Sequence, residues 1–132
     1  MKKKIKKNKK TFFFKITKED YSSFENLSND KSLIHSNKVF CKKNNFKDVV
    51  VYGGIITAKL SYVLSKTLNG NKAISVSWNI NYFKPIYIGD KIKFFVKKSK
   101  NNKLKKFMEK EIVVYKKNSV LASIIVIQKV LN

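Results

Sequence analysis

The stretch GGIITAKLSYVLSKTLNG, from Gly53 to Gly70, decides the fold. One helical face carries Ile55, Ala58, Tyr62 and Ser65, and close by lie Ile56, Leu60, Val63 and Leu64. Because apolar residues cover most of the helical circumference, the stretch predicts a largely buried helix from Ile55 to Leu68. Gly70 follows at a position where glycine commonly ends a helix.

Four strands are predicted after this helix. From Ile74 to Tyr82, apolar residues alternate with Ser and Asn, which is the period-two pattern of a half-buried strand. The other three strands are expected at Lys91–Lys98, at Lys105–Lys116 around Ile112–Tyr115, and at Val120–Val130. The interruptions are expected at Pro85 with Gly89-Asp90, at Asn101-Asn102 and at Lys117-Asn118.

A strand and a short helical insert precede the buried helix. The Phe-rich segment Thr11–Ile16 predicts the first strand. Thr17 resembles a helix N-cap, and apolar residues at helical spacing follow it: Tyr21, Phe24 and Leu27. Ser28-Asn29-Asp30 ends this helix, and a further helical turn is expected at Ser36–Cys41.

The predicted order is strand, helical insert, long helix and four strands joined by short turns. Short connections make consecutive strands antiparallel. An antiparallel sheet wrapped around one long central helix is the hot-dog fold, of the α+β class. Residues 11–132 fit one such domain, and residues 1–10, almost all Lys, predict a disordered, solvated tail.

The formal net charge of +22 first suggests a nucleic-acid binder. However, every Lys or Arg position in the chain is Lys, and the lysines are spread over its whole length. Lys lacks the bidentate geometry of the guanidinium group that most often reads guanine. Nucleic-acid binding is therefore not expected as the main function, whereas a basic surface suits anionic ligands such as coenzyme A or an acidic carrier protein.

Cysteine content and hydropathy bear on the compartment. The single cysteine, Cys41, excludes an intramolecular disulfide, favours a reducing compartment and is expected to be buried rather than nucleophilic. The apolar residues Phe12–Phe14 are interrupted by Lys15 and are too short for a signal peptide, and no apolar run is long enough to span a bilayer. We expect a cytoplasmic protein without a membrane segment.

Asp30 and His35 form the clearest acid–base combination, and His35 is the sole histidine. An imidazole beside a carboxylate suits general acid–base catalysis near neutral pH. In the alternative interpretation, Asp30 caps a helix and His35 is a hydrogen-bonded polar residue near the core. These two residues leave both interpretations open.

Gly53 and Gly54 precede the predicted buried helix. They suit a tight turn, or a site where the free N–H groups of the first helical turn stabilise negative charge on a ligand oxygen. The sequence contains neither a glycine-rich nucleotide loop nor a metal-ligand cluster, so no metal or nucleotide cofactor is expected.

In order along the chain, these segments resemble the MaoC-like hydratase/dehydratase family. The family has an aromatic, Leu-containing helix that ends in Ser-Gly-Asp, then Asn-Pro, an aliphatic residue and His, and the run Phe24–His35 fits with the same Asp-to-His spacing. Val49–Gly54 corresponds to the family's aliphatic stretch ending in His-Gly. A third block is matched by Phe83, Pro85, Gly89 and Asp90. The resemblance covers about Thr11 to Val130.

This resemblance implies a hydro-lyase of the (R)-specific enoyl-CoA hydratase type, with coenzyme A or an acyl carrier protein holding the substrate. Asp30 and His35 would bind and activate the water that adds to an enoyl thioester, or that leaves a 3-hydroxyacyl thioester. The N–H of Gly54, beside Gly53, would bind the thioester oxygen. No cofactor is implied, and at least a homodimer is expected, with the substrate tunnel between subunits.

The chain departs from the family signature at four positions: Asn29 replaces Gly, Ser32 and Leu33 replace Asn-Pro, and Gly53 replaces His. Two other functions stay open. Thioesterases of this fold usually carry an acidic residue on or beside the central helix, but Ile55–Leu68 contains no Asp or Glu. A non-catalytic module that binds acyl thioesters, carriers or nucleic acid is the other alternative.

Overall fold

The N-terminal strand leads directly into a well-capped helix. In the computed structural model, which describes residues 10–102, 104 and 106–132, β1 spans Thr11–Lys15 and α1 spans Lys18–Ser28. The predicted N-cap is confirmed: Thr17 and Asp20 form a reciprocal capping box, with both backbone-to-side-chain hydrogen bonds at 3.0 Å. Of the tail expected at residues 1–10, only Lys10 is described, and its carbonyl accepts a hydrogen bond from Val96 N.

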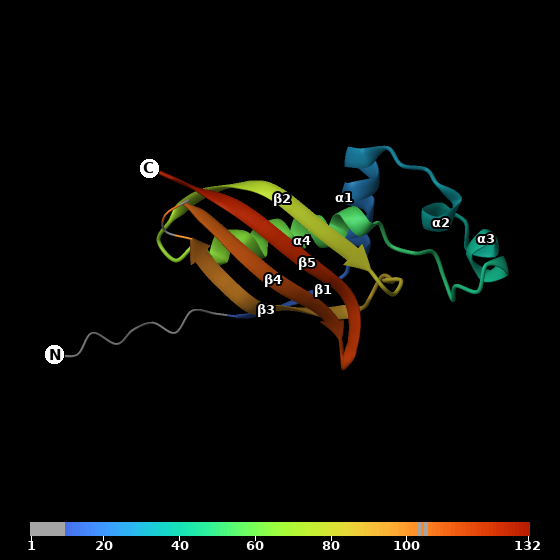
Figure 1. Cartoon of the computed structure of the whole chain (residues 1–132). Helices are drawn as coiled ribbons and strands as arrows, with labels where there is room; N and C mark the ends of the chain where they lie inside the picture. The colour runs from blue at the N-terminus through green and yellow to red at the C-terminus, as the bar shows by residue number, and fades with distance from the viewer. Residues whose placement is uncertain (1–9, 103, 105) are drawn as a thin grey trace.

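Two short helices, α2 (Leu33–Ser36) and α3 (Lys38–Lys43), lie with α1 at one end of the molecule (Figure 1). They replace the single helical turn expected at Ser36–Cys41. The helices separate at Asn37, whose extended backbone ends α2 and whose side chain accepts a hydrogen bond from Phe40 N to cap α3. Cys41 is buried, as predicted, with Sγ 3.1 Å from Ile34 O.

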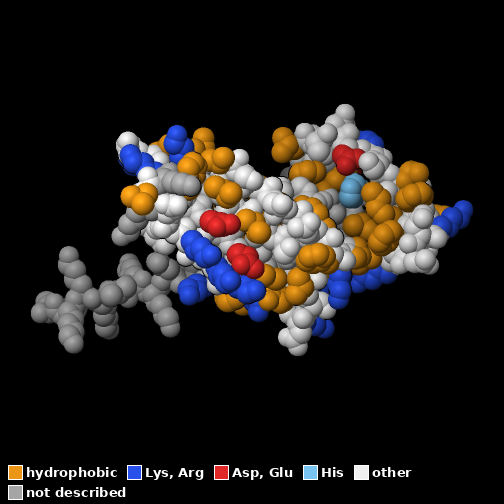
Figure 2. All heavy atoms as spheres, viewed as in Figure 1, with side chains coloured by type: hydrophobic (Ala, Val, Ile, Leu, Met, Phe, Trp, Pro, Cys, Tyr) orange, Lys and Arg blue, Asp and Glu red, His pale blue; other side chains and the backbone are white. Residues whose placement is uncertain are grey.

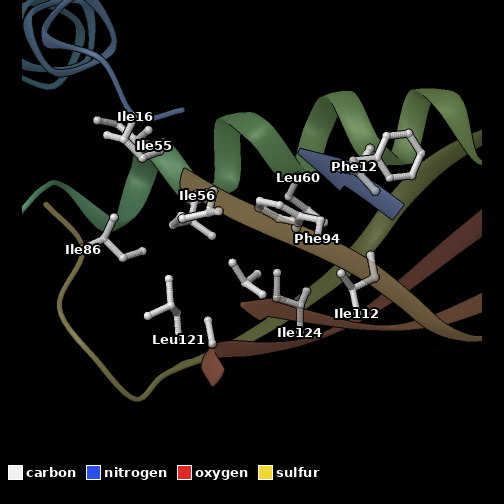
Figure 3. Packing of buried hydrophobic residues seen from close by; sticks show 14 of the residues in the cluster. Phe12, Ile16, Ile55, Ile56, Leu60, Ile86, Phe94, Ile112, Leu121 and Ile124 are labelled. Atoms are coloured by element: carbon white, nitrogen blue, oxygen red, sulfur yellow. The ribbon is translucent and has the colours of Figure 1, made fainter. Parts of the chain in front are cut away.

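The long helix α4 (Gly53–Lys66) packs along one face of the sheet, which curves around it (Figure 1). Its side chains Ile55, Ile56 and Leu60 point into the core, where residues from the strands meet them (Figure 3). The predicted burial is wrong for one face of the helix. Ala58 and Ser65 are exposed because the sheet covers only the opposite side of α4.

Five strands form one antiparallel sheet in the order β1-β3-β4-β5-β2. The last four strands are β2 (Lys72–Tyr82), β3 (Lys91–Asn102), β4 (Phe107–Lys116) and β5 (Ser119–Leu131). Two hairpins join β3, β4 and β5, whereas β2 lies on the far side of β5. The sheet edges are therefore β1 and β2, and one helix against an antiparallel sheet confirms the predicted α+β hot-dog fold.

The prediction of a turn at Asn101-Asn102 is wrong. Both residues belong to β3, and Asn102 pairs with Phe107 at the end of the β3–β4 ladder. Cross-strand pairing thus outweighs the local turn preference of asparagine.

A lysine side chain is buried between β4, β5 and the end of α4. Lys110, on β4, is only 1% exposed, and its Nζ donates to Thr67 O, Thr67 Oγ1 and Gln128 Oε1, each at 2.9 Å. Thr67 is the C-cap of α4, so the ammonium group binds at the negative end of the helix dipole. Burial lowers the pKa of Lys110 to about 8. None of the described helices has the length and apolar character needed to cross a bilayer.

Candidate active site

The segment after α1 turns sharply before it carries Asp30 and His35. Asn29 is the C-cap of α1 and adopts a left-handed conformation with φ 53°. This conformation favours glycine, and asparagine is the usual second choice. Asn29 therefore preserves the turn for which the family signature has Gly.

Ser32 orients the carboxylate of Asp30. The backbone N–H of Ser32 donates to Asp30 Oδ1 at 2.9 Å, and the Ser32 hydroxyl donates to the same oxygen. Hydrogen bonds from the Ser32 side chain and backbone lower the pKa of Asp30. The Asp30 side chain is 38% exposed, and its other oxygen remains available.

The imidazole of His35 has a defined tautomer. Its Nδ1 lies 2.6 Å from Val50 O, and because a carbonyl only accepts, Nδ1 carries the proton. In the neutral ring, Nε2 then has a free lone pair. Nε2 lies 3.8 Å from Asp30 Oδ2, too far for a direct hydrogen bond, so the structure brings the two predicted residues together without joining them.

A cleft of about 370 Å³ opens beside His35. Its walls are mostly apolar and come from His35, Phe46, Val50, Val51, Gly53, Tyr82, Phe83, Lys84, Pro85 and Ile86. Figure 2 shows the histidine in a hollow bordered by hydrophobic side chains, with a carboxylate next to it. Asp30 is not among the lining residues and reaches the cleft through its contact with His35.

Gly53 and Gly54 form the first turn of α4, two residues earlier than the predicted helix start. Neither N–H meets a hydrogen-bond acceptor within the described part of the chain. Gly53 lines the cleft, and its carbonyl accepts a hydrogen bond from the Tyr82 hydroxyl at 3.0 Å. A Cβ on Gly53 would lie 3.1 Å from that ring, so Tyr82 occupies space beside the position where the family has His.

Two tyrosines at the site were not predicted from the sequence. Tyr52 stacks on His35, and Tyr82 lies against Gly53. One sequence feature could have pointed to Tyr52: it is an aromatic residue that ends the run Val49–Val51 and directly precedes Gly53. Tyr82 fits the alternating strand pattern, and no local pattern indicates that the end of β2 borders α4.

Comparison with known proteins identifies the family. The family model described as a MaoC like domain matches residues 2–121. The chain belongs to the MaoC-like family. This MaoC-like domain is 26% identical over 100 residues to the mitochondrial 3-hydroxyacyl-[acyl-carrier-protein] dehydratase of Arabidopsis thaliana, an alignment covering 72% of the chain. The same alignment covers 59% of that relative, so the chain spans about three fifths of the relative's length.

Solved structures share the fold of this MaoC-like domain at low identity. The (R)-hydratase from A. caviae involved in PHA biosynthesis has a TM-score of 0.80 at 16% identity, covering 97% of this chain and 98% of that chain. The R-hydratase PhaJ1 from Pseudomonas aeruginosa has a TM-score of 0.75 at 17% identity, covering 91% and 77%. The HadBC (3R-hydroxyacyl-ACP dehydratase) complex from Mycobacterium tuberculosis has a TM-score of 0.73 at 10% identity, covering 90% of this chain and 92% of that chain.

Proposed function

We propose that this MaoC-like domain is a hydro-lyase that hydrates enoyl thioesters and dehydrates 3-hydroxyacyl thioesters carried by coenzyme A or an acyl carrier protein. The observation that carries the proposal is the Asp30–His35 pair, whose facing atoms are 3.8 Å apart beside an apolar cleft at the start of α4. The names of the relatives support the same reaction class.

In the proposed reaction, the water molecule binds between Asp30 and His35. A gap of 3.8 Å leaves the carboxylate and Nε2 without a direct hydrogen bond, and with the ring proton on Nδ1 both atoms face the gap as acceptors. The pair takes a proton from the water while the water oxygen forms a bond to C3 of the enoyl group. The proton is then returned to C2, so the product is the 3-hydroxyacyl thioester and the enzyme is unchanged.

Negative charge moves to the thioester oxygen while the C3–O bond forms. The N–H groups of Gly53 and Gly54 suit this charge, since they lack acceptors among the described residues and lie at the positive end of the helix dipole. In the proposal, Gly54 donates to the oxygen, and Gly53 lets the thioester approach the backbone closely.

The test is hydration of crotonyl-coenzyme A, followed by loss of the enoyl-thioester absorbance. Asp30→Asn and His35→Ala are each expected to lower kcat by about 100-fold or more, the usual contribution of general acid–base catalysis. Glu19→Gln is the matched control, because it also neutralises a carboxylate but lies in the first turn of α1. Full activity in both site variants would contradict the assignment.

Longer acyl groups and carrier-bound substrates are tested in parallel. A wild-type protein that is inactive on all of them would overturn the proposed function. Release of free thiol without hydration would instead indicate a thioesterase.

We further propose that two copies pair along β2. Within the described residues this strand is an edge of the sheet, paired with β5, and it exposes large apolar side chains: Ile74, Val76, Trp78 and Tyr82. Long apolar edges are rarely left uncovered. Val76→Lys should shift the molar mass in light scattering toward the monomer, whereas Leu27→Lys, at an exposed position of α1, should not. A monomeric wild type would contradict the pairing.

A further inference from the structure

Tyr52 links the acid–base pair to the start of α4. Its ring is buried, with 1% exposure, and it is the N-cap residue directly before Gly53. Its hydroxyl donates to Asp30 O at 2.8 Å and lies 3.3 Å from Glu25 Oε2. Burial raises the pKa of Tyr52, so the hydroxyl keeps its proton and stays a donor throughout the neutral range.

The ring of Tyr52 also supports the imidazole. The ring centroids of Tyr52 and His35 are 4.3 Å apart with an interplanar angle of 33°. Two aromatic residues of α1 pack on Tyr52 in turn, Tyr21 at 5.2 Å and Phe24 at 5.0 Å. The Tyr21 hydroxyl donates to His35 O, so this aromatic layer holds both the ring and the backbone of His35.

The segment that carries the pair has little regular structure of its own. Between Asn29 and Asn37 it forms only the four-residue helix α2, and a helix of that length is not stable alone. The relative positions of the carboxylate and the imidazole therefore depend on contacts with the rest of the domain. Tyr52 contacts both halves, through the Asp30 carbonyl and the His35 ring.

We propose that Tyr52 is a positioning residue: one side chain fixes Asp30 and His35 relative to each other and to the first turn of α4. The inference rests on the proposed function for its kinetic consequence, but its structural part is testable without a substrate. His35 is the sole histidine, so the imidazole nitrogen resonances belong to this one residue and report its tautomer.

The experiment compares Tyr52→Phe, Tyr52→Leu and Tyr115→Phe with the wild type, by NMR of 15N-labelled imidazole and by crotonyl-coenzyme A kinetics. Tyr115 lies on β4, with Lys93 Nζ 4.9 Å from its ring centroid, so its variant removes a hydroxyl away from the site. Wild type and Tyr115→Phe should both show the Nδ1–H tautomer.

Tyr52→Phe keeps the ring but loses the hydrogen bond to Asp30, so it should retain the tautomer and lower kcat about tenfold with little change in KM. Tyr52→Leu should give a mixture of tautomers and lower kcat about 100-fold, as expected for a displaced catalytic group.

A folded Tyr52→Leu protein with the wild-type tautomer and kcat would overturn the proposal, as would losses confined to KM. If Tyr52→Leu does not fold, Tyr52→Phe decides, and an unchanged kcat overturns it. An inactive wild type would overturn the proposed function instead, and the tautomer comparison would still decide whether Tyr52 positions His35.

Discussion

Gly54 lies so close to Phe24 that a Cβ on the glycine would be 2.0 Å from Cζ of the ring. Phe24 also packs against the buried ring of Tyr52, 5.0 Å from it between centroids. The missing side chain thus lets α1 close onto the start of α4. This places the acid–base pair, which follows α1, next to the proposed thioester-binding turn.

Gly54→Ala should therefore destabilise the domain, even though alanine favours helices. The added methyl group has to displace the Phe24 ring, and such overpacking typically costs about 1 to 3 kcal/mol. Chemical denaturation measures the change, with Ser61→Ala as the control because Ser61 is an exposed α4 residue. Equal stability of Gly54→Ala and wild type would contradict the prediction, because the Phe24 ring would then make room for the methyl group at no cost.

Ser32→Ala should raise the pKa of Asp30. The Ser32 hydroxyl stabilises the ionised carboxylate, and its loss leaves only the backbone N–H on that oxygen. Because Asp30 has a lowered pKa in the folded state, its stabilising contribution is present above the unfolded pKa and lost in acid as pH falls through the folded value. The variant should lose that contribution at a higher pH.

Carboxyl 13C titration of Asp30 measures this pKa directly. Ser22→Ala, on the exposed side of α1, should leave it unchanged. A Ser32→Ala titration that coincides with that of the wild type would contradict the role assigned to the hydroxyl.

Lys110 should make the domain more stable as pH rises. Its pKa is about 8 when folded and 10.5 when unfolded, so between these values only the unfolded chain binds the proton. Stability should then increase by roughly 3 kcal/mol from about pH 7 to about pH 10.5 through this group. The cost of burying the charge is fully present below about pH 8.

Lys110→Met removes this group, and the difference in unfolding free energy between variant and wild type should change with pH by that amount. Lys129→Met, at an exposed position of β5, controls for the lower net charge. Parallel pH profiles for wild type and Lys110→Met would rule out the shifted lysine.

Gly53 and Tyr82 should be energetically coupled. A Cβ on Gly53 would lie 3.1 Å from the Tyr82 ring, a contact that the half-exposed ring relieves only by moving. The change in unfolding free energy caused by Gly53→Ala is thus expected to be about 1 kcal/mol more favourable to the folded state in a Tyr82→Ala background than in the wild type. A double-mutant cycle by thermal or urea unfolding measures the coupling, and additive effects would refute it.

The elements that sequence patterns predicted are those with strong local signals. Thr17 predicted the start of the first helix as an N-cap, and the structure adds a capping box with Asp20 that needs no tertiary contact. The alternation from Ile74 to Tyr82 predicted a strand, and β2 spans it. In contrast, Asn102 carried a turn signal but joins β3, because the partner strand decides where a hairpin ends.

The site was predicted only in part, for a similar reason. Spacing singled out Asp30 and His35, and the structure places them together. The residues that hold them come from elsewhere: Val50 and Tyr52 are 15 and 22 positions away from the residues whose atoms they bind. Such pairings depend on the packing of α1 against α4, which no local pattern encodes.

Each of three hydrogen bonds that support the acid–base pair has a main-chain carbonyl as its acceptor. Nδ1 of His35 binds the carbonyl of Val50, while Tyr52 and Tyr21 bind the carbonyls of Asp30 and His35. A saturation library should therefore be asymmetric: position 50 should accept several β-branched or aliphatic residues, whereas positions 21 and 52 should demand aromatic ones. In divergent relatives, the residue type at position 50 would then vary among apolar residues, while the main-chain carbonyl that holds the imidazole stays in place.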